Sequence, residues 1–452
     1  MIASAFLLLA GCASNAPGRV VVFGIDGLDW GMVDRLAAGG DMPTFTRLAA
    51  EGVRGTVTNT VPVMSPILWT SIASGYPGEI HGIGGWTTGR GHGYDGSDVR
   101  VMRIWDVATA QGLRSLVVGW LMTFPASPID GEVVSDRFIW SFPMNKDPDD
   151  PSLLVDRAQH EALVGLVTPP SIDARVAALI PDEAWLSSHP LAYQVEEYGA
   201  PFHPLLRDEL HLRAFEALWP ESDAALGMVY VNGPDQVSHI YWPYADPEAA
   251  KAMRANPMDH YTQINRETEG GKNRRAAPFS EAPITAEQVD FGARFVPDYY
   301  RYIDTLLGRV LDVVDLETTT LLVCSDHGFR LSPTNPLANG GHTRAAAVLW
   351  AGRGVSVGTP LPAGTVLDIA PTLFALLGLP GAADWTGQPQ AAVFPGLLSP
   401  PPVASWVLSD RAEIAVESGT KANPQLMEQL EALGYVDGEG KPLLGASRDP
   451  LR

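Results

Sequence analysis

Unbroken apolar runs, each ended by turn-forming or charged residues, recur along the chain. The first is RVVVFGI at 19–25, which is followed at once by Asp26 and Gly27. A run without polar alternation is typical of a strand that is buried on both faces of a parallel sheet. Similar runs stand at 115–125, 226–235, 318–328 and 345–352. We therefore expect buried strands that carry polar residues at their ends.

Helical patterns fill the intervals between these runs. Apolar residues recur at helical spacing in four segments, at 42–52, 103–112, 211–219 and 298–314. Strands that alternate with helices predict an α/β fold with a mostly parallel central sheet and helices on both faces. The expected architecture is a three-layer sandwich.

Two internal segments and both ends depart from this rhythm. Residues 138–215 are rich in Pro, Asp and His, and residues 243–295 are polar and punctuated by Gly and Pro, so we expect both to be insertions that form a cap. Residues 396–452 begin with a proline-rich stretch and include one amphipathic helix, which predicts a C-terminal appendage. The main domain is then 19–395.

The first residues, MIASAFLLLAGC at 1–12, form a short apolar stretch that closes with Leu-Ala-Gly-Cys. This ending resembles the lipobox of bacterial lipoproteins, in which the cysteine becomes the lipidated first residue. About ten apolar residues are too few to span a bilayer, so a signal peptide fits better. We expect lipid on Cys12, a tether at 13–18 and a periplasm-facing place in the cell envelope, at the outer rather than the inner membrane. The stretch lacks the positively charged segment that usually precedes it, so the true start could lie upstream. A frayed apolar N-terminus is the alternative.

Composition narrows the range of partners. The chain has 452 residues, is 46% hydrophobic and carries a formal net charge of −21. Such a charge argues against nucleic acid polymers and anionic lipid surfaces as partners. Besides Cys12 the chain has only Cys324, which lies in an apolar run, so we expect a buried thiol and no disulfide framework.

Candidate metal ligands follow the predicted strands, and in an open α/β sheet such strand ends share one edge. They are Asp26 after the first strand, Asp235 and His239 after the run at 226, Asp326 and His327 after the run at 318, and His342 soon after. Asp235 and His239 are four residues apart, which places them on one face of a helical turn. Each residue alone could be a turn residue or an ordinary histidine. Together they form a mixed N and O donor set that suits zinc.

Ser65 raises two possibilities. It stands before Pro66 and an apolar helical run that stops at Gly75, which is the usual arrangement of a helix cap. It also lies in the part of the chain that should reach the same sheet edge, where a serine can act as a nucleophile. The local pattern alone leaves both roles open.

The ordered motifs resemble the alkaline phosphatase superfamily, and within it the type I phosphodiesterase / nucleotide pyrophosphatase branch. The matching segments are GIDG at 24–27, MPTFTRLAAEG at 42–52, SPILWTSIASGYPGEIHGI at 65–83, PDQVSH at 234–239, SDHG at 325–328, GGH at 340–342 and DIAPTLFALLGLP at 368–380. The resemblance implies an alkaline-phosphatase-like catalytic domain over 19–395.

The resemblance also implies a site with two divalent metal ions, which we expect to be zinc. One would be held by Asp235, His239 and His342. The other would be held by Asp26, Asp326 and His327, with Ser65 reaching it. Ser65 would then both cap its helix and attack a phosphoric ester, forming a covalent phosphoserine. Because a free serine hydroxyl is a weak nucleophile, activation by a cation replaces the usual histidine base.

The sequence departs from the branch at two positions. Trp86 stands where those enzymes have an asparagine that contacts a phosphoryl oxygen, and Ser65 stands where they usually have threonine. Trp86 is therefore a candidate substrate-binding residue, and nucleotide specificity is open. Arg90, Arg103, Arg330 and Arg344 are candidate replacement donors, and each could instead be a surface or structural arginine. The basic residues Lys272, Arg274 and Arg275 could meet an anionic substrate or belong to a solvated loop.

Other functions remain as alternatives. A sulfatase would need Cys or Ser followed by x-Pro-x-Arg, whereas Pro66 follows Ser65 directly. A phosphoglycerate mutase shares the fold but does not suit a lipid-anchored protein. A phosphomonoesterase, a phospho-group transferase or a non-catalytic metal-bound lipoprotein would use the same residues. We expect a hydrolase of small phosphate esters, a diesterase rather than a monoesterase; the oligomeric state is not indicated.

Overall fold

The computed structural model describes residues 18–88, 93–139, 165–198, 204–268, 279 and 282–408. An eight-stranded sheet forms its centre, in the order β2-β10-β7-β1-β6-β3-β4-β5. The strands are β1 (Arg19–Ile25), β2 (Val53–Thr58), β3 (Ser115–Val118), β4 (Gly131–Val134), β5 (Val167–Thr168), β6 (Leu226–Val231), β7 (Thr319–Cys324) and β10 (Ala345–Gly352). Each predicted apolar run thus contains a strand. Cys12, Arg90, Lys272, Arg274 and Arg275 lie outside the described residues.

The sheet is mostly parallel, as predicted. β1 pairs in parallel with β6 and β7, and β3 continues the parallel set to β4. β10 runs antiparallel to both β7 and β2, and β5 runs antiparallel to β4. An antiparallel strand begins at the edge where its parallel neighbours end, so residues just before β10 reach the same edge as residues just after β1, β6 and β7.

Strand β1 explains why the central runs are apolar without alternation. Val21, Phe23 and Ile25 belong to one hydrophobic core, whereas Val20 and Val22 belong to another on the opposite face. A strand that separates two cores must bury both of its faces. The shorter β4 and the edge strand β2, with its partly exposed residues, lack this signal and were not predicted.

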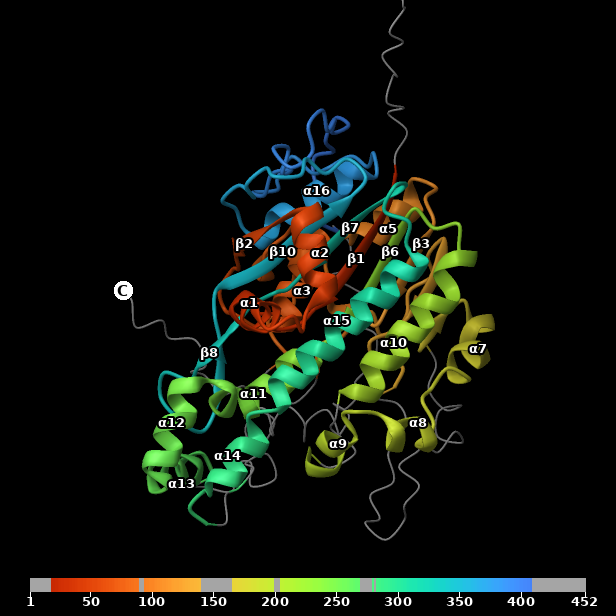
Figure 1. The fold of residues 1–452 in the computed structure, drawn as a ribbon. Helices are drawn as coiled ribbons and strands as arrows, with labels where there is room; N and C mark the ends of the chain where they lie inside the picture. The colour runs from red at the N-terminus through yellow and green to blue at the C-terminus, as the bar shows by residue number, and fades with distance from the viewer. Residues whose placement is uncertain are drawn as a thin grey trace, which may run out of the picture.

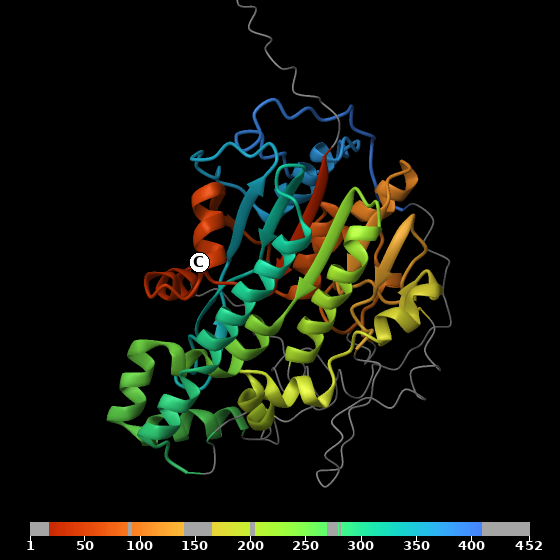
Figure 2. The ribbon, with the colours of Figure 1, turned by 45° about the vertical axis from the view of Figure 1, so that its right-hand side comes forward.

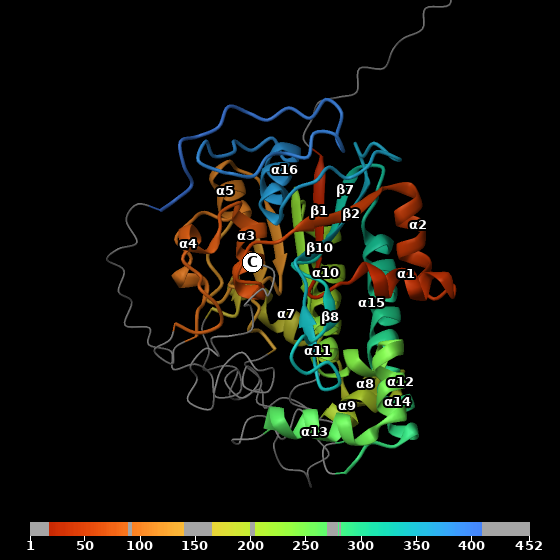
Figure 3. The ribbon, with the colours of Figure 1, turned by 90° about the vertical axis from the view of Figure 1, so that its left-hand side faces the viewer.

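Helices cover both faces of the sheet (Figure 1). One layer contains α1 (Trp30–Ala38), α2 (Pro43–Glu51), α10 (Leu205–Leu218), α11 (Gly233–Ala245) and α15 (Phe295–Val313). The other contains α3 (Ser65–Ser74), α5 (Ile104–Ala110) and α16 (Ile369–Leu376). Figure 3 shows the sheet edge-on between α3, α5 and α16 on one side and α2 and α15 on the other. The three-layer prediction is confirmed.

Further helices lie beyond the carboxyl ends of the strands. Figure 2 shows α11 leading away from the sheet to a group of three, α12 (Pro247–Ala255), α13 (Pro257–Thr268) and α14 (Ala286–Gly292). These three fall within the predicted insertion 243–295. In the predicted insertion 138–215 lie α7 (Asp173–Ala177), α8 (Glu183–Ser188), α9 (Ala192–Tyr198) and α10, but α10 packs against the sheet as part of a helical layer. A cap function of these segments stays a prediction.

The remaining elements are short. They are α4 (Gly78–His81), β8 (Phe329–Leu331) and β9 (Gly340–His342), of which β8 and β9 form a separate two-stranded sheet. Within the described residues, no helix combines the length and apolar character needed to cross a membrane. Cys324 is a buried free thiol, as expected.

Candidate metal centre and nucleophile

The six predicted ligands come together at one edge of the sheet. Asp26 directly follows β1, Asp235 and His239 lie on α11 after β6, and Asp326 and His327 directly follow β7. His342 ends β9 and reaches the same edge because β10, which follows it, is antiparallel. The side chains form two groups of three, and in each group the potential ligand atoms lie within 4.8 Å of one another.

The first group, Asp26, Asp326 and His327, is called the closed group here. Its side chains are 2%, 0% and 0% exposed. His327 Nε2 lies 3.4 Å from Asp26 Oδ1 and 3.5 Å from Asp326 Oδ2. Asp326 Oδ1 accepts hydrogen bonds from the amides of Gly27 at 3.4 Å and His327 at 3.0 Å, so its other oxygen faces the group.

The second group, Asp235, His239 and His342, is called the open group. Its side chains are 7%, 13% and 11% exposed. Asp235 Oδ1 lies 3.3 Å from Nε2 of each histidine, and the two Nε2 atoms are 2.9 Å apart. Three donor atoms therefore converge at one point with a partial opening to solvent.

The two groups adjoin each other. His327 Nε2 of the closed group lies 3.6 Å from Asp235 Oδ1 of the open group, and the rings of His327 and His342 stack with centroids 3.6 Å apart. Gly27 permits this approach. Its φ is +69°, and a Cβ there would lie 2.9 Å from the Asp235 Cα and 2.7 Å from the Phe329 ring.

Two histidines are oriented by backbone carbonyls. His327 Nδ1 lies 3.2 Å from Gly328 O, and His342 Nδ1 lies 3.3 Å from Val63 O. A carbonyl can only accept, so the proton of each neutral imidazole belongs on Nδ1. The lone pair is then on Nε2, which is the atom that faces the other ligands in each group. Carbonyl-oriented imidazoles are common among metal-binding histidines.

Aromatic donors fix the first carboxylate. Asp26 Oδ2 accepts hydrogen bonds from Trp69 Nε1 at 3.1 Å and from the Tyr230 hydroxyl. Asp26 Oδ1 accepts from Ser65 Oγ at 3.3 Å. One carboxylate oxygen is thus held by the protein, while the other faces both His327 and the serine.

In the absence of a cation, burial and mutual repulsion disfavour the charged form of two of the three carboxylates. Burial, together with the charges of Asp326 and Asp235, raises the pKa of the Asp26 carboxyl well above its usual range. Burial also raises the pKa of Asp326, to about 6. For Asp235 burial acts in the same direction, but His239 and His342 outweigh it and lower the pKa. The pKa of His327 falls well below its usual range through burial and the charge of His342.

These residues fit a pair of divalent cations. Asp326 Oδ2, Asp235 Oδ1 and His327 Nε2 are buried polar atoms without a hydrogen-bond partner in the described part of the chain, and all three point into the groups. Buried polar atoms normally have partners, and a cation would supply one to each. The mixed N and O donors suit zinc. The role of the six residues as ligands stays a prediction.

Ser65 is placed beside the closed group and is 1% exposed. One expectation about it is wrong. The structure makes Met64, with φ −140° and ψ 127°, the N-cap of α3, and no side chain caps the helix. Ser65 is the first helical residue, and its hydroxyl bonds to Asp26 instead. Gly75 ends the helix with φ +79°, as expected.

The N-terminus of α3 offers few backbone donors to a ligand. The amides of Ile67 and Leu68 both donate to Met64 O, at 3.0 Å each, and Pro66 has no N–H. In the first turn only the amide of Ser65 remains as a candidate donor to a ligand.

The predicted substrate-binding residues differ in their distance from the site and in their contacts. Arg103 is buried, pairs with Asp106 at 2.8 Å and donates to Met122 O, so it is structural. Arg330 is exposed. Arg344 donates to Asn59 O at 3.2 Å, and Asn59 Nδ2 donates to Asp326 O at 3.0 Å, which places Arg344 near the closed group. Trp86 is partly buried and packs against a hydrophobic core; its contact with substrate stays a prediction.

Sequence reasoning missed Trp69 and Tyr230. Trp69 had a signal, because it lies four residues after Ser65 and therefore on the same helix face. Tyr230 lies in the buried strand β6, where an aromatic residue is usually part of the core. The only signal was its hydroxyl, which needs a partner when buried.

Comparison with known proteins agrees with this geometry. The sequence matches the type I phosphodiesterase / nucleotide pyrophosphatase family over residues 20–354. The chain belongs to this family. The part that matches the phosphodiesterase family includes both groups of ligands and Ser65. No curated protein matches the chain.

Solved structures show the fold. A 2-O GAG sulfatase is similar with a TM-score of 0.50 and 13% identity, over 85% of this chain and 75% of that chain. Human ectonucleotide pyrophosphatase / phosphodiesterase 5 is similar with a TM-score of 0.42 and 14% identity, over 80% of this chain and 95% of that chain. Phosphonoacetate hydrolase from Sinorhizobium meliloti 1021 is similar with a TM-score of 0.40 and 16% identity, over 70% of this chain. The match spans only 57% of the length of that hydrolase. The fold of this phosphodiesterase family member is alkaline-phosphatase-like.

Proposed function

We propose that the protein is a metal-dependent hydrolase of phosphoric esters that uses Ser65 as its nucleophile. The observation that supports this most strongly is the position of the Ser65 hydroxyl, 3.3 Å from Asp26, next to two adjoining groups of carboxylates and imidazoles. Family membership favours phosphodiester or pyrophosphate substrates.

The closed group would hold one divalent cation and the open group the other. A pair of such cations, when bound, supplies Lewis acidity that favours the serine alkoxide and balances charge on the phosphoryl group and the leaving oxygen. The protein residues contribute the geometry. Trp69 and Tyr230 hold one oxygen of Asp26, so that its other oxygen keeps a fixed position toward Ser65.

The proposed reaction has two steps. Ser65 Oγ bonds to phosphorus while the bond from phosphorus to the leaving oxygen breaks. The serine proton passes to Asp26 Oδ1, its hydrogen-bond acceptor, and then to the leaving oxygen, which departs as an alcohol. Water then attacks phosphorus of the phosphoserine, which still carries the second ester group when the substrate is a diester. The bond from phosphorus to Oγ breaks, and the proton that the water loses goes to Ser65 Oγ. A diester substrate yields a monoester and an alcohol.

Metal analysis combined with paired substrates tests the proposal. Purified protein should contain about two zinc ions per chain and should hydrolyse bis(p-nitrophenyl) phosphate faster than p-nitrophenyl phosphate. Ser65→Ala should lower turnover by at least about 10³-fold while the zinc content stays the same. Brief reaction with bis(p-nitrophenyl) phosphate followed by acid quench should trap a p-nitrophenyl phosphoryl group on Ser65, in the unmodified protein only.

Three results would contradict the proposal. Zinc without turnover of either phosphate ester would favour a non-catalytic metal-binding protein. Faster hydrolysis of p-nitrophenyl sulfate than of the phosphates would favour a sulfatase. Loss of zinc and of folding in Ser65→Ala would make the serine structural. Faster hydrolysis of the monoester would correct only the substrate preference.

We also propose that Cys12 carries a lipid that anchors the protein to the cell envelope, facing the periplasm. The support is the Leu-Ala-Gly-Cys ending of the apolar stretch at 1–12. Expression in a bacterial host with an alkyne-tagged fatty acid should label the protein, and Cys12→Ser should abolish the label. Equal labelling of both would contradict the anchor.

A further inference from the structure

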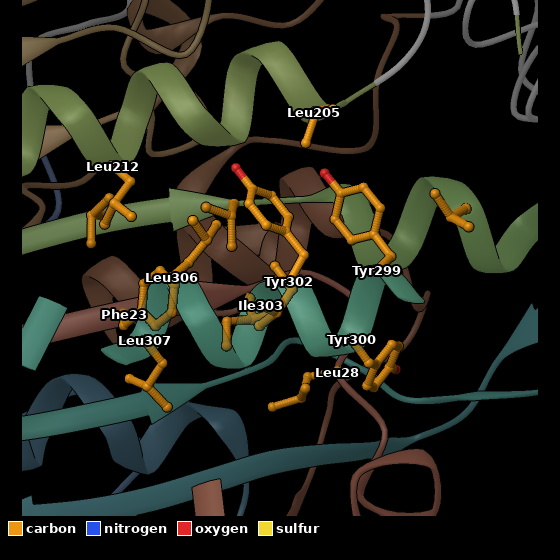
Figure 4. Close-up of a cluster of buried hydrophobic side chains, with 14 of the residues drawn as sticks. Phe23, Leu28, Leu205, Leu212, Tyr299, Tyr300, Tyr302, Ile303, Leu306 and Leu307 are labelled. Atoms are coloured by element: carbon orange, nitrogen blue, oxygen red, sulfur yellow. The ribbon is translucent and has the colours of Figure 1, made fainter. Parts of the chain in front are cut away.

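Helix α15 carries two neighbouring tyrosines that point in opposite directions. In Figure 4, Tyr299 points toward α10, whereas Tyr300 points to the other side, beside Leu28. Both side chains are 0% exposed, so their hydroxyls need partners inside the protein. Each finds its partner next to one of the two ligand groups.

Tyr300 holds the loop that follows Asp26. Its hydroxyl donates to Gly27 O at 3.0 Å and accepts from the Asp29 amide at 3.0 Å. These two bonds bracket Leu28 and fix the turn at the end of β1. The amide of Gly27 in turn donates to Asp326 Oδ1 at 3.4 Å. Tyr300 thus acts on the closed group through the backbone that carries Asp26.

Tyr299 reaches the open group through Asp208 of α10. The Tyr299 hydroxyl donates to Asp208 Oδ2 at 2.9 Å. The same carboxylate accepts from the amides of Asn232 at 3.0 Å and Gly233 at 2.9 Å. These amides begin α11, the helix that carries Asp235 and His239. A carboxylate at this place satisfies helix amides that have no partner within the helix.

Close packing shows that this arrangement is specific. A Cβ at Gly233 would overlap the Tyr299 ring, so glycine is required where α11 begins against α15. The Asp208 side chain is fully buried, and replacing it would leave two amides without an acceptor. The position of α11 relative to α15 is therefore fixed by both shape and hydrogen bonds.

From these contacts we infer that α15 sets the distance between the two cation sites, with Tyr300 as the positioning residue of the closed group and Tyr299 with Asp208 as the positioning pair of the open group. The inference rests on the proposed function, because it needs two bound cations. None of the three residues belongs to either ligand group. Loss of one should weaken one cation and spare the other.

The chain provides matched controls on the same helix. The Tyr302 hydroxyl, also buried, donates to Glu209 Oε2 at 2.8 Å, and Glu209 belongs to neither ligand group. Asp304 accepts from the amides of Thr44 at 3.1 Å and Phe45 at 2.9 Å, at the beginning of α2. Asp304 therefore does for α2, which has no ligand, what Asp208 does for α11.

The experiment compares Tyr300→Phe and Asp208→Asn with Tyr302→Phe and Asp304→Asn. Each protein is loaded with zinc and dialysed against increasing concentrations of a chelator, and the zinc retained per chain is measured. All four variants should lower the melting temperature of the chelator-treated protein. Only Tyr300→Phe and Asp208→Asn should weaken zinc retention, each at one site and by roughly 10- to 100-fold.

Combining the test variants with His239→Gln shows which of the two cations each variant affects. In His239→Gln the open group is incomplete, so the cation that is retained should lie in the closed group. Adding Tyr300→Phe should weaken that cation, whereas adding Asp208→Asn should not. The visible spectrum of bound cobalt(II) should change accordingly, because it reports the geometry around the metal. If Asp208→Asn fails to fold, Tyr299→Phe takes its place.

The inference is overturned if the unmodified protein binds two zinc ions and the test variants retain zinc no less tightly than the controls. It is also overturned if Tyr300→Phe and Asp208→Asn weaken the same cation. An unmodified protein that binds no zinc would instead overturn the proposed function, and the inference with it.

Discussion

The closed and open groups have similar ligands but different surroundings. Asp26, Asp326 and His327 are enclosed between the central strands, whereas Asp235, His239 and His342 lie on α11 and β9 with partial access to solvent. Metal sites that keep an accessible position can exchange ligands, and fully enclosed sites hold theirs. In the proposed reaction, we therefore expect the closed group to serve the buried Ser65 and the open group to serve the step that exchanges with water.

The largest expected effect separates ligands of the two groups. His327→Gln should lower turnover of bis(p-nitrophenyl) phosphate on the order of 10³-fold, because the cation nearest Ser65 is lost. His239→Gln should lower the same turnover only about tenfold, because a water molecule can enter the open group in place of the imidazole. Turnover and zinc content are measured for both variants. Equal losses, or a larger loss for His239→Gln, would contradict the assignment.

A slightly smaller effect should appear in metal release. Treatment of the zinc-loaded protein with a colorimetric chelator should release zinc in two phases of equal amplitude. The rates should differ roughly 10- to 100-fold, with the open group releasing first because its histidines are partly exposed. In His239→Gln the fast phase should disappear. A single phase in the unmodified protein would show that the two groups are equivalent.

Gly27→Ala tests whether the groups depend on each other. A methyl group there would meet the Phe329 ring and the Asp235 backbone, in addition to the cost of a positive φ. We expect a loss of roughly 1–3 kcal/mol in unfolding free energy, measured in urea, and weaker retention of zinc at both sites.

Gly40→Ala is the control for this change. Gly40 has φ +84°, and a methyl group at this position would have no neighbouring atom within 4 Å, so the variant isolates the backbone cost. It should cost about 1 kcal/mol and leave zinc retention unchanged. The contact between the groups would be unimportant if both alanine variants behaved alike.

The last prediction concerns the pH dependence of the unfolding free energy, which should reflect buried histidines that lie outside the two ligand groups. Burial lowers the pKa of His81 to about 4 and that of His211 to about 3, outside both groups. The folded-state pKa lies below the unfolded value, so only the unfolded chain takes up these protons as the pH falls from about 6.5 toward 4. Unfolding free energy should therefore fall with pH by up to about 1.4 kcal/mol per pH unit for each histidine.

His81→Gln tests this in chelator-treated protein, where no cation contributes. Its amide can replace both ring nitrogens, which bond to Ile67 O and the Ile83 amide. Urea unfolding between pH 7.5 and 4.5 should show a shallower pH dependence in the variant than in the unmodified protein. Identical slopes would mean that His81 does not stay neutral in the folded state.

Much of the site could be predicted because its ligands stand at the ends of strong local patterns. Asp26 and Asp326 directly follow unbroken apolar strands, and a parallel sheet brings such ends together. The direction of β10 could not be predicted, because an apolar run looks the same in either orientation. The fit of His342 into the open group depends on that direction.

Other features depended on packing or on backbone detail. Tyr300 and Asp208 bond to loop residues that are 273 and 24 positions away in the sequence, and no local pattern connects them. The Ser-Pro pair favours a serine at the N-cap, because proline is most common at the first helical position. The extended backbone of Met64 instead makes Met64 the N-cap and frees the Ser65 hydroxyl to reach Asp26.

Anomalous diffraction at the zinc edge from crystals of the zinc-loaded protein addresses the two-cation site most directly. We expect two peaks per chain, about 3.5–4 Å apart, one among Asp26, Asp326 and His327 and the other among Asp235, His239 and His342. Ser65 Oγ should lie within bonding distance of the first. A single peak, peaks elsewhere on the protein, or a Ser65 side chain turned away from the metal would contradict the proposed site.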